Sequence, residues 1–150
     1  MAWEFIAQNR AGALATNDAA HLPHIALVYV VVHHDLSIYF TTRAEGRKYE
    51  NLMRDPQVAM MFAGANSLQQ LQLTGHVEQV TDLEAELDIL HELMKLRYAD
   101  KSLPRPQVNL LEPGVRKEYV IFKVTGDEMT YSDFETSQVG KYKPEFIKIM

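Results

Sequence analysis

The sequence predicts a mainly β fold, an antiparallel barrel or sandwich with a few peripheral helices. About six short runs have strand character, with apolar and polar residues alternating or with many β-branched residues. These runs follow one another in hairpin order and do not alternate regularly with helices, which argues against a parallel α/β sheet. The 150 residues are 47% hydrophobic, enough for one domain with its own core, so we expect a single domain over residues 1–150.

The first segments predict a helix followed by a hairpin. Residues 3–8 can form a short helix, and strands are expected over 11–16 and 24–32, "AGALAT" and "HIALVYVVV". Turn-forming residues between them include Asn17, Asp18 and Pro23. The second run is apolar almost throughout, which is typical of a strand that is covered on both faces.

The middle of the chain predicts strand, helix and two further strands. In 36–42, the alternation places Leu36, Ile38 and Phe40 on one face. A helix follows and ends before Pro56, because the residue before proline disfavours helix. Strands over 57–62 and 70–80 come next; the second alternates, with Leu71, Leu73 and Val77 on one face and Gln70, Gln72, Thr74, His76 and Glu78 on the other.

The second half contains the longest predicted helix, over 81–100. Its apolar stripe runs from Leu83 to Leu96, and Thr81 with Glu84 predicts a capping box at its start. Residues 101–115 contain three prolines and predict an irregular connection. Two closing strands are expected on either side of Gly126-Asp127, and no clear pattern follows from 135 onward.

Charge and composition narrow the classes of function. The net charge is −5 and there is no cysteine, so a general nucleic-acid binder is disfavoured and thiol chemistry is excluded. No apolar run reaches about 18 residues and no secretion signal is visible, so we expect a cytoplasmic protein without a membrane span. Neighbouring His33 and His34 would point to opposite faces of a strand, and the other histidines lack ligand-like spacing, so no metal is expected.

One stretch, "YFTTRAEGRKYENL", predicts an anion site. Thr41 and Thr42 end a strand, and Arg47 and Lys48 open the next helix, with Gly46 before them. Hydroxyls, cations and a helix N-terminus are the groups that bind a phosphate. The alternative is that Arg47 and Lys48 form a solvated helix face and the threonines are simply strand formers.

The polar face of 70–80 is a second candidate. The amide of Gln70 can donate and accept hydrogen bonds together, which suits the edge of a heteroaromatic ring. The alternative, favoured when this face is taken alone, is that it meets solvent.

Taken together, these segments resemble the FMN-binding split β-barrel family, which includes pyridoxamine 5′-phosphate oxidase. The resemblance covers about residues 5 to 80. It rests on the order and spacing of "LAT", Pro23, "YFTT", "GRK", "NL", "DPQVAMMF" and "LTGHVEQV". It implies a split barrel that is a homodimer with two flavins in its interface.

The resemblance also implies a set of FMN-binding residues. Thr41, Thr42, Arg47 and Lys48 match the positions that bind the FMN phosphate. The second strand runs along the flavin ring, and Gln70 matches a glutamine that reaches it. The residues of this strand beside the ring are Ala26, Leu27, Val28 and Tyr29. Tyr131 stands roughly where relatives have an aromatic residue that covers the flavin.

Departures from the family pattern argue against pyridoxamine phosphate as the substrate. Ala26 stands where those oxidases have an arginine for the FMN phosphate, and Val31 where they have a lysine for the substrate phosphate. Their C-terminal aromatic and arginine signature is not recognisable. We therefore expect an FMN-dependent oxidoreductase acting on another small molecule. The alternatives are a non-catalytic flavin-binding or redox-sensing protein, and a relative that uses F420; haem is not favoured, because the tail has no histidine.

Overall fold

The protein folds around one eight-stranded sheet, in which every pair of neighbouring strands is antiparallel. A computed structural model describes residues 2–66, 68–101, 109–134 and 145–148. Its elements are α1 (Ala2–Gln8), β1 (Ala11–Asn17), β2 (Pro23–Tyr29), β3 (Val31–Val32), β4 (Ile38–Arg43), α2 (Arg47–Arg54), β5 (Gln57–Ala63), β6 (Gln69–Val80), α3 (Leu83–Ala99), α4 (Pro113–Arg116), β7 (Tyr119–Asp133) and β8 (Glu145–Lys148).

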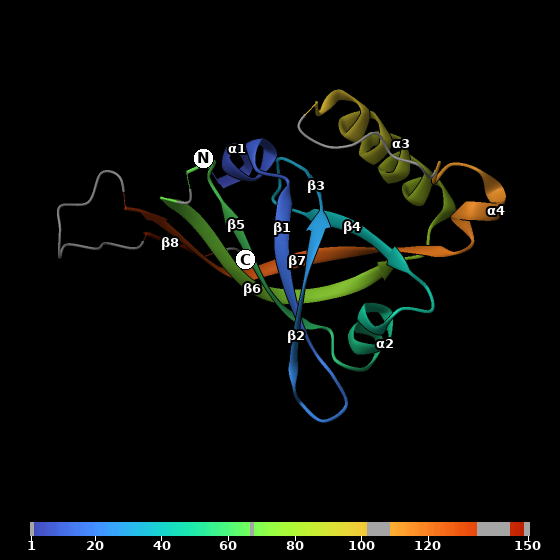
Figure 1. The fold of residues 1–150 in the computed structure, drawn as a ribbon, viewed down its shortest axis with the longest axis horizontal. Coiled ribbons are helices and arrows are strands. Elements are labelled where there is room, and N and C mark those ends of the chain that lie inside the picture. Colours follow the sequence, from blue (N-terminus) through green and yellow to red (C-terminus); the bar gives the residue numbers. More distant parts are fainter. Residues whose placement is uncertain (1, 67, 102–108, 135–144, 149–150) are drawn as a thin grey trace.

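The order of the strands closes the sheet on itself. Along the sheet it is β2-β1-β5-β6-β7-β4-β3, with β8 paired to β7. The two end strands, β2 and β3, are separated in sequence by Val30 alone. The sheet therefore curls until both of its edges belong to one continuous stretch of chain, and β2 and β4 approach each other without pairing (Figure 1). The predicted antiparallel barrel with peripheral helices is confirmed.

The inside of the barrel holds the main core. Phe40, Phe62 and Phe122, from β4, β5 and β7, are fully buried in it. Leu71, Leu73 and Val77 also point inward, as the alternation of β6 predicts. Burial of that many large apolar groups is the main force that holds the barrel together, at about 1.5–3 kcal/mol for each side chain.

The expectation that 24–32 is one strand with both faces covered is wrong. The run breaks at Val30 into β2 and β3. Val31 and Val32 are buried, but Ile25 and Leu27 are each 76% exposed. No described element packs on the outer face of β2, on which both side chains lie. Apolar residues on that face therefore meet solvent in the single chain.

The helix α3 is confirmed, but its predicted cap and stripe need correction. Its N-cap is Asp82, whose carboxylate accepts a hydrogen bond from the Ala85 N–H, so Thr81 and Glu84 do not form the capping box. Leu83 is exposed. The helix packs on the outside of the barrel through Ile89, Leu90, Leu93 and Met94, against Val31 and Ile121. The true buried face thus begins about two turns after the helix start.

The two predicted closing strands are one strand, β7, of 15 residues. Gly126 pairs with Gly75 of β6, and the register between the two strands shifts at Thr74/Gly75. Gly126 and Asp127 therefore lie at a β-bulge, which bends the strand without ending it. Within the expected irregular connection the structure forms the short α4, while 102–108 lie outside the described residues.

Among the described residues, no helix combines the length and apolar character that a membrane crossing needs.

Candidate anion-binding site

A cleft of about 540 Å³ lies where β2 and β4 approach each other beside the start of α2. Five of the predicted cofactor-binding residues line it: Ala26, Thr41, Thr42, Arg47 and Lys48. The other lining residues are Leu14, Thr16, His24, Ile25, Arg43, Gly46, Asn51 and Tyr119. The structure thus brings together the second strand and the "YFTT…GRK" stretch, although they are well separated in the sequence.

The start of α2 leaves backbone donors for a ligand. Gly46 is its N-cap, in an extended conformation, and no side chain forms a cap hydrogen bond there. The first N–H groups of a helix have no partner within the helix, and they carry the positive end of the helix dipole. A Cβ on Gly46 would meet only ordinary contacts with Arg43, so the fold itself does not require a glycine at this position.

Lys48 adds a basic side chain to the lining of the cleft. Its side chain is half-buried, and burial lowers the pKa of its amine. Among the described residues, its amine makes no salt bridge with a carboxylate, since the close contacts there between a basic side chain and a carboxylate all involve histidines. A half-buried ammonium group without a counter-ion costs free energy, and an anion in the cleft would relieve that cost.

Arg43 and Tyr119 form one wall of the cleft. The guanidinium of Arg43 lies over the Tyr119 ring, 6.0 Å from its centroid. The pKa of Arg43 is raised, and the largest cause is a hydrogen bond with the Tyr119 side chain. This pair holds a third cation near Arg47 and Lys48.

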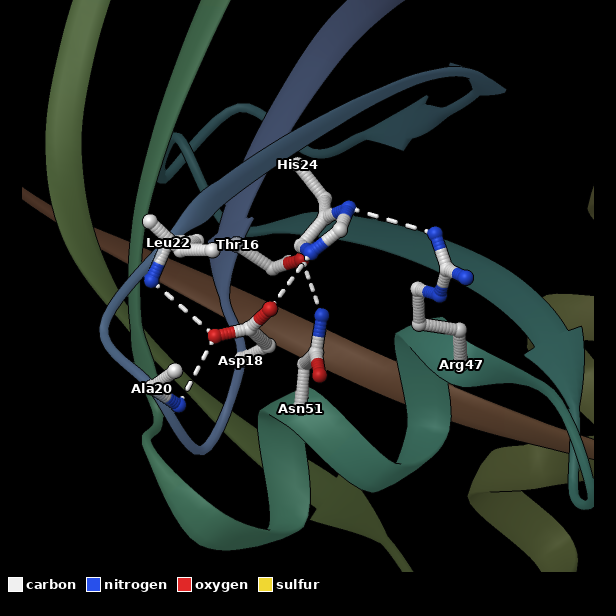
Figure 2. Close-up of polar contacts among 7 residues, drawn as sticks. All are labelled: Thr16, Asp18, Ala20, Leu22, His24, Arg47 and Asn51. Carbon is white, nitrogen blue, oxygen red and sulfur yellow. Dashed lines mark hydrogen bonds and ion pairs between the residues drawn. The ribbon is translucent and has the colours of Figure 1, made fainter.

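Three polar contacts that the sequence did not predict lie beside the cleft (Figure 2). His24 contacts Asp18 through Nε2 at 2.9 Å and Arg47 through Nδ1 at 3.3 Å. From α2, the buried Asn51 donates to the hydroxyl of Thr16 on β1 at 3.1 Å and so ties the helix to that strand. The sequence alone indicated no contact partner for His24 or Asn51, because His24 meets Arg47 and Asn51 meets Thr16 only when the β1–β2 hairpin packs on α2.

The remaining predicted residues of β2 cannot all face the cleft with their side chains. Leu27 points outward and Val28 into the core. The Tyr29 ring packs towards α3, with its hydroxyl 3.4 Å from Asp100, and burial together with that carboxylate raises its pKa. Because β2 is an end strand, however, one edge of its backbone pairs with no other described strand. Its contribution to a ligand would come mainly from backbone groups.

Gln70 and Tyr131 do not line the cleft. Gln70 lies in β6, paired with Ala63 and Ser132, and is half-buried. Tyr131 contacts Phe5 of α1 edge to face, with 5.5 Å between ring centroids. Their roles in cofactor binding stay predictions, because the single chain does not bring Gln70 and Tyr131 to the five predicted residues that line the cleft.

The outer face of the sheet beside β2 is apolar. It includes the exposed Ile25, Leu27 and Met61. A shallow pocket of about 290 Å³ on this face is lined in part by small side chains, Ala13, Ala15 and Ala59. Apolar surface of this kind is typical of a protein–protein contact.

Comparison with known sequences gives a family match over most of the chain. The family model described as "Pyridoxamine 5'-phosphate oxidase" matches residues 2–133. A curated pyridoxine/pyridoxamine 5′-phosphate oxidase from Rhizobium leguminosarum bv. trifolii is 36% identical over 74 residues, which are 49% of this chain. The matched region spans only 36% of that relative's own length.

Solved structures share the fold at low identity. A NimC/NimA family protein from Clostridium acetobutylicum has a TM-score of 0.70 at 18% identity, covering 97% of this chain and 90% of its own. A pyridoxamine 5′-phosphate oxidase-related, FMN-binding protein from Nostoc punctiforme has a TM-score of 0.62 at 12% identity, and the alignment covers 97% of this chain and 94% of that protein. An F420 reductase has a TM-score of 0.65 at 20% identity, and the alignment covers 84% of this chain and 93% of that protein. These likenesses confirm the predicted split-barrel fold.

Proposed function

Because the chain belongs to the pyridoxamine 5′-phosphate oxidase family, we propose that it binds FMN with the phosphate in the cleft between β2, β4 and α2. The observation that carries the proposal is the half-buried Lys48 amine, which has no ion-pair partner among the described residues. Arg47, Thr41 and Thr42 line the same cleft. This is the donor set that a phosphate dianion requires.

The residues of the cleft fit the two ends of FMN differently. The phosphate would accept from Arg47, Lys48, the two threonine hydroxyls and the N–H groups that open α2. The flavin ring carries N–H and C=O groups on its edge, which match the free backbone edge of β2 from Ala26 to Tyr29. Gln70 and Tyr131 would complete the ring site.

FMN, when bound, supplies hydride and electron transfer, so the chain itself needs to hold and orient the cofactor and admit a substrate. Hydride transfer to or from a flavin does not strictly need an acid or base from the protein. We therefore propose an oxidoreductase that acts on a small molecule other than pyridoxamine phosphate.

Two positions distinguish this chain from the pyridoxamine phosphate oxidases, and one of them, Val31, bears on the substrate. Val31, which stands where those oxidases have the substrate lysine, is fully buried against α3 and cannot contact a ligand. Ala26, where they have an arginine for the FMN phosphate, lines the cleft with a side chain that carries no charge. A charged hydrogen bond is worth about 1.5–3 kcal/mol, so the missing lysine would weaken binding of the substrate phosphate, whereas the missing arginine removes one contact of the FMN phosphate.

We further propose that two copies associate through the apolar outer face beside β2. Ile25 and Leu27 would lose their exposure there. Gln70 lies on the same side of β6 as Gln72 and Thr74, which line the pocket on this face. A second copy would thus place its own cofactor near Gln70, which explains why this residue lies outside the cleft of the single chain.

The direct test is an absorbance titration of the purified protein with FMN, with riboflavin and F420 in parallel. We expect flavin bands that saturate with FMN, and weaker binding of riboflavin, which lacks the phosphate. The FMN-loaded protein should oxidise pyridoxamine phosphate far more slowly than ordinary enzymes of this family. If F420 saturated the protein and FMN did not, F420 would be the cofactor. Turnover of pyridoxamine phosphate at the ordinary rate of the family would contradict the exclusion of that substrate.

The lowered pKa of Lys48 predicts how FMN affinity depends on pH. A phosphate favours the charged amine, so FMN affinity should fall as pH rises through the pKa of Lys48, which lies below the ordinary 10.5. Above neutral pH the phosphate is already a dianion and adds no slope of its own. We expect Lys48→Arg to abolish this part of the pH dependence, because arginine stays charged; riboflavin binding, measured in parallel, corrects for ionisation of the ring. An unchanged profile in Lys48→Arg would place the phosphate elsewhere.

A further inference from the structure

The side chain of Arg47 is held at the cleft by a chain of two residues that belong to the β1–β2 hairpin. We propose that Asp18 and His24 are positioning residues that fix the Arg47 guanidinium in place and so make the site selective for a phosphate-bearing ligand. This inference rests on the proposed function, since it concerns the same cleft. Figure 2 shows the three side chains in line, Asp18 to His24 to Arg47.

Hydrogen-bond chemistry fixes the direction of both contacts. A guanidinium has donors only, so the Arg47 NH1 group must donate to Nδ1 of His24, 3.3 Å away. An ionised carboxylate has acceptors only, so Nε2 of His24 must donate to Asp18, 2.9 Å away. Both contacts are therefore made at once only by a neutral imidazole with its proton on Nε2.

Asp18 is itself held rigidly. Its other oxygen accepts from the N–H groups of Ala20 at 2.8 Å and Leu22 at 3.0 Å. The hydrogen bond from His24 and those backbone donors lower the pKa of Asp18 to about 2. The carboxylate is thus ionised and oriented before any ligand arrives.

The intervening histidine matters because it separates the carboxylate from the cation. If Asp18 paired directly with Arg47, it would compete with a phosphate for the guanidinium. A neutral imidazole orients Arg47 and leaves its full charge available. Arg47 is otherwise an exposed, flexible side chain, and ordering it before binding removes part of the entropy cost of binding.

Two substitutions at His24 separate the two contacts. In His24→Asn, the side-chain oxygen stands close to where Nδ1 was and can still accept from Arg47, but the amide cannot reach Asp18. In His24→Gln, the terminal amide nitrogen stands close to where Nε2 was and can still donate to Asp18, but Arg47 loses its acceptor. Both variants lose the imidazole ring, but only His24→Gln loses the hydrogen-bond acceptor for Arg47. Comparing the two therefore tests whether Arg47 needs that acceptor.

The readout is the ratio of FMN affinity to riboflavin affinity. We expect His24→Gln to lower FMN affinity about tenfold and riboflavin affinity less than twofold, because the positioned guanidinium is coupled to the phosphate, which riboflavin lacks. His24→Asn should keep most of the ratio. In an Arg47→Ala background, His24→Gln should have no further effect. Equal losses for both flavins, or a full effect without Arg47, would assign His24 a merely structural role and overturn the inference.

Two measurements do not depend on flavin binding. Nitrogen NMR of the ligand-free protein should show His24 as the neutral Nε2–H tautomer, and Asp18→Asn should weaken that preference. If neither flavin binds, the proposed function fails, and inorganic phosphate is titrated against the Arg47 side-chain signal instead. A saturable shift that weakens in His24→Gln would support the positioning role; absence of any shift, or the Nδ1–H tautomer, would overturn it.

Discussion

Replacing Arg47 and Lys48 together with alanine is expected to lower FMN affinity by roughly 10²- to 10⁴-fold while the fold stays intact. Both side chains line the cleft, and each charged hydrogen bond to a phosphate contributes about 1.5–3 kcal/mol. Two such bonds correspond to about 3–6 kcal/mol, and every 1.4 kcal/mol is about tenfold in affinity. Isothermal titration with FMN, or quenching of flavin fluorescence, measures the loss.

The stability of this double variant should not fall, because neither side chain belongs to the core and Lys48 is half-buried without a counter-ion in the described part of the chain. A charge-matched control is Arg54→Ala with Lys95→Ala, since both residues are exposed and lie outside the cleft. The control should keep FMN affinity within about twofold, as surface substitutions away from a site usually do. Equal losses in the two double variants would mean that net charge, and not this cleft, attracts the ligand.

The local part of this site was predictable from the sequence. Thr41, Thr42, Arg47 and Lys48 fall within eight residues, so a strand ending beside a helix start places them together almost regardless of the rest of the fold. Asp18 and His24 were not predictable. Their roles depend on how the β1–β2 hairpin packs on α2, which no spacing within the hairpin encodes.

The wrong predictions about the fold have a common cause. The types of residue in a strand do not show which element covers the strand or where the strand ends. An apolar run predicted full burial of β2, yet Ile25 and Leu27 are exposed because no described element packs on that face of the strand. The dipeptide Gly126-Asp127 predicted a turn, since such pairs are common in hairpins, yet it forms a bulge within β7. A bulge and a turn use the same residue types, and only the partner strand distinguishes them.

That bulge makes Gly75 the position where a single methyl group should destabilise the protein most directly. A Cβ on Gly75 would collide with the carbonyl oxygen of Thr125 and lie 3.0 Å from the Cα of Gly126. Both atoms are backbone of β7, so no side chain can turn aside to make room. Relief would require β6 and β7 to move apart in the middle of the barrel, next to the fully buried Val124.

We therefore expect Gly75→Ala to lower the free energy of unfolding by about 3 kcal/mol or more, the upper end of the usual cost of overpacking. For a chain of this size that corresponds to a Tm lower by roughly 6–12 °C, measured by circular dichroism or calorimetry. Gly114→Ala is the matched control, because a Cβ there meets no described residue within 4 Å and the glycine lies in α4. Alanine at that position should leave stability unchanged or raise it by about 0.4–1 kcal/mol. If Gly75→Ala melted like the control, β6 and β7 would have to lie farther apart at Gly75 than the bulge places them, and the close approach of their backbones would be wrong.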